Sequence, residues 1–329
     1  MPLAFPRDMY LAAGVGSGLA TLAALPLWRA WCRRTGLVDD PGHRKIHTEP
    51  IPLAGGLAVM TGLLAPVLFG LVVLQLGLLG AGASGPLAYG LGRRAGQLGV
   101  ILAGAVAMVG LGWLDDKFEL RPAVKFGGQL FIAVGVAAAG VRITLFVPSV
   151  AFSYAVTVLW ILTVTNAFNF MDNMNGLCAG LGAVGAVFFA LSAGSHGQYL
   201  VTLIALLTGG SLLGFLPYNY PRATSFLGDA GSHLTGYLLA VLAILPHFYS
   251  AKHSHPWAVI SPLLILAVPL GDMAWVVRLR WRSGEPFYMG DNNHLSHRLV
   301  RRGWTKAQAV LLIWLMAVAG GMLAFVLQY

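Results

Sequence analysis

Charged side chains are scarce in this chain. Only 10% of its 329 residues are Asp, Glu, Lys or Arg, 12 of them are acidic, and 57% of the chain is apolar. Mean hydropathy is +0.74. Because a soluble domain carries about 25% charged residues, this composition excludes an ordinary soluble protein. There are two cysteines, Cys32 and Cys178, both expected at span ends on one inner side, so the sequence gives no support for a disulfide framework.

Signals for export and for nucleic-acid binding are also missing. The first apolar run, from Tyr10 to about Trp31, has no preceding basic region and no small-residue cleavage site, which indicates an uncleaved first span. The net charge of +9 is explained by basic residues that flank membrane spans, so no nucleic-acid partner is expected. Without a low-complexity tract or a soluble segment, residues 1–329 are predicted to form a single polytopic membrane domain.

Long apolar runs fill most of the chain. A run of roughly 17–25 apolar residues can cross a bilayer as a helix. The sequence therefore predicts an all-α integral membrane protein, a bundle of about ten transmembrane helices. The predicted spans cover about residues 10–31, 54–79, 97–114, 126–142, 150–166, 177–194, 199–216, 233–250, 257–277 and 307–327.

The charges are distributed unevenly between the two sides. Loops that follow the first, third, fifth, seventh and ninth spans, together with Arg29 near the end of the first span, hold 16 of the 21 Lys and Arg residues. The positive-inside rule places these loops in the cytoplasm and both termini outside. The same side holds every acidic residue except Asp8, if Asp272 near the end of the ninth span is included. Since charge near hydrocarbon is costly, carboxylates at a membrane edge are candidate functional groups, and the sequence predicts an active site at the cytoplasmic face.

The first segment, residues 38–56, combines Lys45 and His47 with turn-forming residues and ends at Gly55-Gly56, where the second span begins. Backbone N–H groups at a helix start favour anions, so a phosphate-bearing ligand would fit here. The alternative is an ordinary basic loop beside the membrane.

The second segment carries two adjacent acids, Asp115 and Asp116, at the end of the third span, and Lys125 at the start of the next. Two neighbouring carboxylates bind a divalent cation or separate their pKa values, so that one acts as a base. Lys125 would hold a phosphate as a point charge. The alternative is a helix-end cluster paired with its own basic residues.

The third segment repeats Asn and Asp at three-residue spacing: Asn166, Asn169, Asp172 and Asn175. On a helix this spacing places the four side chains near one face. An unpaired amide or carboxylate there costs roughly 2–7 kcal/mol, so the stripe needs partners. A ligand site is favoured over a helix-packing seam.

The fourth segment contains Asn219 and a Gly-Asp-x-Gly-Ser run centred on Asp229, just before a span. A carboxylate beside flexible backbone at a helix start suits Mg²⁺ bridged to phosphate, because Mg²⁺ takes few protein carboxylates. The alternative for Asp229 is a plain helix cap.

The fifth segment contributes His294 and His297. With no cysteine or third histidine close by in the sequence, phosphate contact is favoured over zinc. A histidine pair in a solvated loop is the alternative. Taken together, acids for a metal, cations for phosphate and Gly-rich helix starts indicate phosphoryl transfer.

From Asp39 to about Gly303, these segments resemble the polyprenyl-phosphate N-acetylhexosamine-1-phosphate transferase family, which includes WecA, TagO and MraY types. The first loop is closer to the WecA-like branch. The resemblance implies a bundle of ten or eleven transmembrane helices with a cytoplasmic active site. It also implies transfer of a sugar-1-phosphate from a UDP-sugar to polyprenyl phosphate, with release of UMP and use of Mg²⁺ or Mn²⁺.

The matched positions carry implied roles. Asp229 is the expected metal ligand, and the expected catalytic residues are Asp115, Asp116 and Asp172. The expected substrate-binding residues are Lys45, His47, Lys125, Asn169, Asn175, Asn219, His294 and His297. The chain departs from the family pattern at three positions. Asn175 stands where bacterial members usually have a second Asp. Asn292 stands where an Arg is usual, and Ser296 stands where a His is usual.

The expected setting is the bacterial cytoplasmic (inner) membrane, crossed several times, with UDP-GlcNAc as the default donor, undecaprenyl phosphate as the acceptor and the bilayer as the surrounding medium. A homodimer is left open. A secondary transporter would instead show charges at mid-membrane and internal repeats. A CDP-alcohol phosphatidyltransferase would show a spaced Asp-Gly-x-x-Ala-Arg pattern, which this sequence lacks. A non-catalytic scaffold remains the third alternative.

Overall fold

The computed structural model describes residues 5–40, 49–78, 81–145, 147–246, 256–286 and 292–328. Over these residues the chain is almost entirely helical, which confirms the predicted all-α class. The longer helices are α1 (Arg7–Thr35), α2 (Gly55–Gln75), α3 (Ala81–Phe118), α4 (Pro122–Ala138), α5 (Val150–Met171), α6 (Leu177–Ser195), α7 (Tyr199–Asn219), α8 (Gly228–Ile244), α10 (Ala267–Ser283) and α12 (Lys306–Val326). The shorter elements are a 3₁₀ turn (Pro256–Ile260), α9 (Ser261–Ile265), α11 (Leu295–Arg301) and the antiparallel strands β1 (Val38–Asp39) and β2 (Ile51–Pro52).

Each predicted span coincides with at least one helix, but the count of ten is not confirmed. Within the described residues, seven helices are long and apolar enough to cross a membrane, or eight if one bent pair forms a single span. Helices α4 and α8 have 17 residues each, which at 1.5 Å per residue is short for a hydrocarbon layer of about 30 Å.

Two predicted spans differ from the structure, one by a break in its helix and the other by an earlier start. The span at 257–277 is broken at Leu266, and the helices on either side of the break are bent by 70°. Pro269 explains the break, since it has no N–H to donate to the carbonyl of Ile265. The third helix begins well before residue 97 and includes Arg93 and Arg94.

Helix α8 lies at the centre of the bundle. Nearly all of its residues are buried, and it packs against α2, α3, α5, α6 and α7. A helix that is apolar around most of its circumference is expected to be enclosed in this way. The start of α8 therefore brings its residues into contact with several neighbouring helices.

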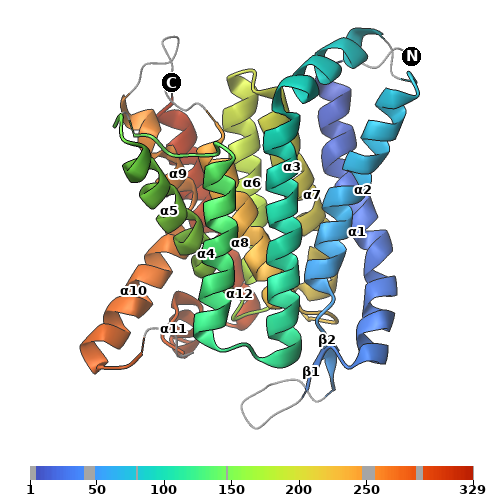
Figure 1. Cartoon of the computed structure of the whole chain (residues 1–329). Coiled ribbons are helices and arrows are strands. Elements are labelled where there is room, and N and C mark those ends of the chain that lie inside the picture. The colour runs from blue at the N-terminus through green and yellow to red at the C-terminus, as the bar shows by residue number, and fades with distance from the viewer. Residues whose placement is uncertain are drawn as a thin grey trace.

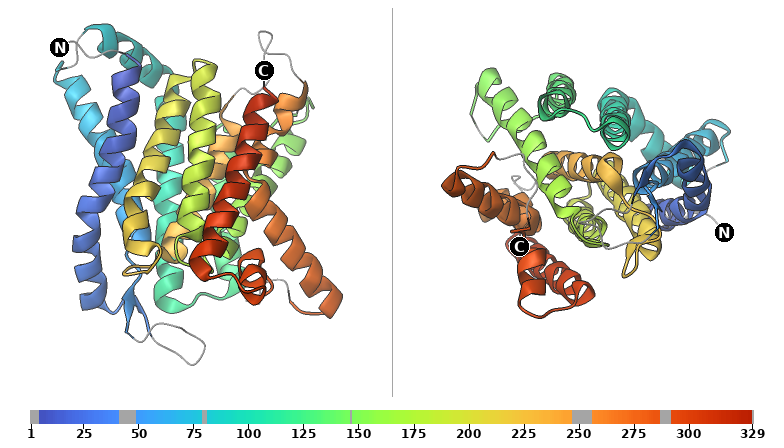
Figure 2. Two further views of the ribbon diagram at one scale, coloured as in Figure 1. Left: turned by 180° about the vertical axis from the view of Figure 1, so that it is seen from behind. Right: turned by 90° about the horizontal axis from the view of Figure 1, so that it is seen from below.

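The ends of the bundle differ in content. Both termini lie at one end, while the β1–β2 hairpin, the turn between α3 and α4, and α11 lie at the other (Figure 1). The view from behind shows the same division (Figure 2). Termini on a shared side agree with the even number of alternating spans expected from the apolar runs. Both cysteines, Cys32 and Cys178, are free and buried, as expected.

Candidate active site

The first and fourth segments are joined by backbone hydrogen bonds. Gly55 N–H donates to the carbonyl of Phe226 at 2.9 Å, and Gly56 N–H donates to that of Leu227 at 3.0 Å. These two N–H groups at the start of α2 are thus occupied by protein, and the expectation that they bind an anion is wrong. Lys45 and His47 lie outside the described residues.

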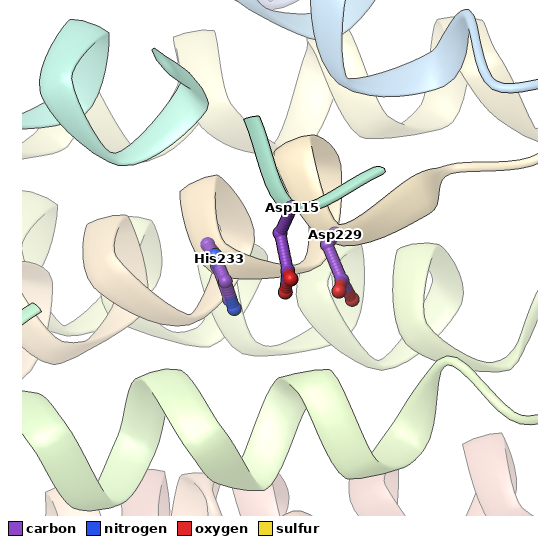
Figure 3. Close-up of side chains that lie close together, drawn as sticks. All are labelled: Asp115, Asp229 and His233. Atoms are coloured by element: carbon purple, nitrogen blue, oxygen red, sulfur yellow. The ribbon is translucent and has the colours of Figure 1, made fainter. Parts of the chain in front are cut away.

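A cluster of opposite charges lies where α3, α4, α5 and α8 meet. The ammonium of Lys125 is 2.6 Å from an oxygen of Asp115 and 2.9 Å from an oxygen of Asp229. It also donates to the amide oxygen of Asn169 at 3.4 Å. The Asp115 side chain is 9% exposed and that of Asp229 is 32% exposed, so the cluster opens toward solvent mainly at Asp229. Figure 3 shows these two carboxylates side by side, with His233 next to them.

The polar stripe of α5 faces this cluster. The Asn169 amide nitrogen donates to Asp229 at 2.5 Å and to the Ser232 hydroxyl at 3.0 Å. One turn earlier, Asn166 donates to the side-chain oxygen of Gln129 at 2.7 Å. The expectation that the stripe must find polar partners is confirmed, and Asn169 connects it directly to the charged residues.

Asp116 caps the N-terminus of α8. Its two carboxylate oxygens accept hydrogen bonds from the backbone N–H groups of Asp229 at 2.8 Å and Ala230 at 3.1 Å. A negative group at a helix N-terminus satisfies free N–H groups and interacts favourably with the helix dipole. The close approach depends on Gly112, where an added Cβ would collide with the backbone of Asp229.

Asp172 follows the end of α5 and also contacts the start of α8. It accepts a backbone hydrogen bond from Gly228, a residue with φ of +71°, for which glycine is suited. Desolvation by burial, followed by the negative charges of Asp229 and Asp116, raises the pKa of Asp172 to about 8.

Asn219 and Asn175 organise the loops around the site. The side-chain oxygen of Asn219 accepts from Gly176 N–H at 2.6 Å, and its nitrogen donates to the Ser225 carbonyl at 3.0 Å. Asn175 donates to the Pro221 carbonyl at 3.3 Å. Asn219 is 3% exposed, so it acts as a buried clamp between the third and fourth segments.

The fifth segment is fixed to the end of α5 and to α10. The Ser296 hydroxyl donates to the side chain of Asn173 at 2.7 Å. His294 is buried and lies 2.6 Å from the carboxylate of Asp272. Burial, together with the neighbouring His294, lowers the pKa of His297.

All four segments that carry described candidate residues therefore meet at one end of the bundle.

One group of side chains has the composition of a cation site. Ligand atoms of Asp115, Asp229 and His233 lie within 4.8 Å of one another. Carboxylate oxygens suit Mg²⁺ and Mn²⁺, so the donors around Lys125 fit the expected metal. Across the described parts of the chain, neither His294 nor His297 belongs to such a group.

His233 and Gln129 were not predicted from the sequence, and Asp272 was counted only among the acids of the inner side. His233 is fully buried, with its Nε2 atom 3.3 Å from the Gln129 amide nitrogen. Its position four residues after Asp229 places both on one face of α8, a spacing that was visible in the sequence. The contacts of Gln129 and Asp272 bring together residues 104 and 22 positions apart, which no local pattern reveals.

Comparison with known proteins agrees with this geometry. Residues 98–247, which include most of the site, match the model of glycosyl transferase family 4. The chain is 32% identical to the probable undecaprenyl-phosphate N-acetylglucosaminyl 1-phosphate transferase of Bacillus subtilis, covering 96% of this chain and 84% of that protein. It is 33% identical to the decaprenyl-phosphate N-acetylglucosaminephosphotransferase of Mycobacterium tuberculosis, covering 94% and 80%.

A more distant relative extends the comparison. The undecaprenyl-phosphate alpha-N-acetylglucosaminyl 1-phosphate transferase of Escherichia coli is 29% identical, with 92% of this chain and 79% of that protein covered. Similarity at this level spans nearly the whole chain and all the segments that form the site. The chain therefore belongs to glycosyl transferase family 4, among the polyprenyl-phosphate N-acetylhexosamine-1-phosphate transferases.

Proposed function

We propose that this protein transfers N-acetylglucosamine-1-phosphate from UDP-GlcNAc to a polyprenyl phosphate and releases UMP, as the first membrane step of a cell-envelope glycan pathway. The names of the relatives give the donor group and the lipid acceptor. The structural observation that carries the proposal is the contact of Lys125 with both Asp115 and Asp229, because this cluster combines groups for a metal and for phosphate.

The reaction is a displacement at phosphorus. A non-bridging oxygen of the lipid phosphate attacks the β-phosphorus of the donor and forms a new P–O–P linkage. The bond between the β-phosphorus and the oxygen bridging to the α-phosphorus breaks, and UMP leaves with that electron pair. Because a phosphate monoester has a second pKa of about 6, the acceptor is already largely ionised near pH 7 and needs no strong base.

The acids of the site then serve mainly to position cations. We assign Asp229 and Asp115 to hold Mg²⁺ or Mn²⁺, since their ligand atoms belong to a group whose members lie within 4.8 Å of one another. When bound, such an ion neutralises charge on the donor diphosphate and makes its phosphorus more electrophilic. Asn169 fixes the orientation of Asp229, and Lys125 adds positive charge for the phosphates.

The remaining candidates act around this centre. His294 and His297 lie on the segment that covers the end of α5, where they can contact donor phosphate. Asp172 lies beside the start of α8 and responds to the charge of Asp229. Asn175 and Asn219 hold the loops that would surround the nucleotide, and Lys45 and His47 are assigned to phosphate by the family resemblance alone.

The orientation and assembly of the protein are part of the proposal. The end of the bundle that carries the site faces the cytoplasm of a bacterial inner membrane, because 16 of the 21 Lys and Arg residues belong to that side. There it would meet UDP-sugars directly. Residues 1–329 act as one membrane domain, and a homodimer is compatible with a site built wholly within one chain.

The direct test is to offer purified protein in vesicles a panel of UDP-sugars with undecaprenyl phosphate and Mg²⁺. We expect a lipid product whose mass equals undecaprenyl diphosphate plus N-acetylglucosamine less one water. A product with another sugar would keep the reaction and change the donor. Absence of any lipid product, combined with solute flux into the vesicles, would support the transporter alternative. Asp229→Asn should form no product while keeping the elution profile of the folded protein.

A further inference from the structure

A carboxylate–histidine pair links α10 to the fifth segment. One oxygen of Asp272 lies 2.6 Å from Nδ1 of His294, and the other accepts the backbone N–H of Leu295 at 2.6 Å. The side chains are 1% and 6% exposed, so solvent hardly competes for either contact. Asp272 thus engages two consecutive residues at the start of α11 with both of its oxygens.

The pairing determines which nitrogen of His294 carries hydrogen. An ionised carboxylate only accepts hydrogen bonds, so Nδ1 must be the protonated nitrogen. Nε2 is then the nitrogen available to a ligand, as acceptor in the neutral ring and as donor in the charged ring. The ring is also restrained by Phe170, whose ring meets it edge to face with centroids 5.8 Å apart.

Phe170 connects this pair to the charged cluster. It follows Asn169, the residue whose amide donates to Asp229, so the His294 ring packs against the same turn of α5 that holds the proposed metal ligand. We propose that Asp272 is a positioning residue of the transferase: by accepting Nδ1–H it fixes the orientation of His294 and supports the charged ring, whose Nε2–H then donates to the donor diphosphate. This inference rests on the proposed function.

The substitution Asp272→Asn separates this role from a structural one. The amide oxygen can still accept the Leu295 N–H and keep the start of α11 in place, whereas the amide nitrogen then faces Nδ1 as a donor. Nδ1 must then stay unprotonated, so the ring carries hydrogen on Nε2 alone and cannot become the cation that a diphosphate favours. We expect kcat to fall about 10–100-fold, the range known for the partners of metal-bound histidines, while KM for UDP-GlcNAc changes little. Asp272→Glu, which restores the carboxylate, should recover part of the loss.

A double-mutant cycle tests whether Asp272 acts through His294. In the His294→Gln background, adding Asp272→Asn should cause almost no further loss, because the group that Asp272 positions is already gone. If the second substitution lowered kcat by its full factor, or if Asp272→Asn alone kept wild-type kcat, the proposal would be overturned.

A spectroscopic readout keeps this test independent of turnover. In protein labelled with ¹⁵N-histidine, the signal that disappears in His294→Gln should be that of a ring protonated at Nδ1, and in Asp272→Asn it should move to the Nε2-protonated position. If the His294 signal of the wild type were that of a ring protonated only at Nε2, the assignment of hydrogen to Nδ1 would be contradicted. If the wild type made no lipid product, the proposed function would fail, whereas the spectrum would still decide the tautomer.

Discussion

The carboxylate of Asp116 accepts the backbone N–H of Asp229 at 2.8 Å, so the last turn of α3 caps the first turn of α8. Its neighbour Asp115 instead contacts Lys125 at 2.6 Å. Two adjacent acids that look equivalent in the sequence therefore perform different tasks. Asp115 belongs to the charged cluster, while Asp116 holds the helix that presents Asp229.

Asp116→Ala should lower the stability of the protein together with its activity. Removing a helix-capping side chain costs about 0.5–2 kcal/mol, and here two N–H groups would lose their acceptor. Asp116→Asn keeps one acceptor oxygen and should be less damaging. Thermal unfolding in detergent measures both variants. An unchanged Tm for Asp116→Ala, with activity lost, would show that Asp116 takes part in the chemistry instead.

Lys125→Met should abolish turnover and make the protein unusually responsive to divalent cations. Loss of the ammonium leaves the carboxylates of Asp115 and Asp229 without their shared cation. We expect turnover to fall at least about 100-fold, as for other removed charge-stabilising groups. Without metal the Tm should drop, and added Mg²⁺ should raise it more than in the wild type, because binding to the folded state stabilises it.

Lys125→Arg is the matched control for that experiment. It keeps the charge in a different shape, so its metal-free Tm should lie closer to that of the wild type. If Mg²⁺ shifted the Tm of all three proteins equally, the cation would bind elsewhere than at the cluster around Lys125.

Asn219→Ala should reduce stability more than Asn175→Ala. The first leaves Gly176 N–H and the Ser225 carbonyl without a partner in a buried position, at about 1–3 kcal/mol for each group. The second removes one 3.3 Å contact to Pro221. Thermal unfolding and KM for UDP-GlcNAc distinguish the roles of Asn219. A normal Tm with a greatly raised KM would show direct contact with the nucleotide and would contradict the clamp.

The sequence predicted well the features that depend on local pattern. Apolar runs located the helices, and the three-residue spacing placed Asn166 and Asn169 on one face of α5, where they bond to Gln129 and Asp229. Ten alternating spans, an even number, predicted that both termini lie at one end, as observed. These properties follow from side-chain periodicity and from the length of the apolar runs.

Features that depend on contacts between distant helices were not predictable. Nothing in the pair Asp115-Asp116 tells which acid caps the backbone N–H groups of α8. The answer depends on how closely Gly112 lets α3 pack against the start of α8. The anion site expected at Gly55-Gly56 was wrong because those N–H groups meet the carbonyls of residues 226 and 227. The pairing of Asp272 with His294 likewise requires the break after α9 to direct α10 toward α11.

Asp172→Asn should stabilise the metal-free protein in a pH-dependent manner. Burial and the charges of Asp229 and Asp116 raise the pKa of Asp172 from 3.8 to about 8. Between these values the folded state holds a proton that the unfolded state lacks, so this group lowers stability as pH rises, until the effect levels off above about 8. Asn carries no such penalty. The Tm of the variant relative to the wild type should therefore increase from pH 5 to pH 8. A constant difference would contradict the raised pKa.

UDP-GlcNAc radiolabelled at its β-phosphorus distinguishes transfer of a sugar-1-phosphate from transfer of the sugar alone. The label is followed in reconstituted vesicles with undecaprenyl phosphate and Mg²⁺. If the cluster of Lys125, Asp115 and Asp229 transfers the sugar-1-phosphate, the label enters the lipid, UMP appears in equal amount, and Asp229→Asn stops both. Label that remained in the aqueous phase as UDP while the sugar entered the lipid would contradict transfer of the sugar-1-phosphate.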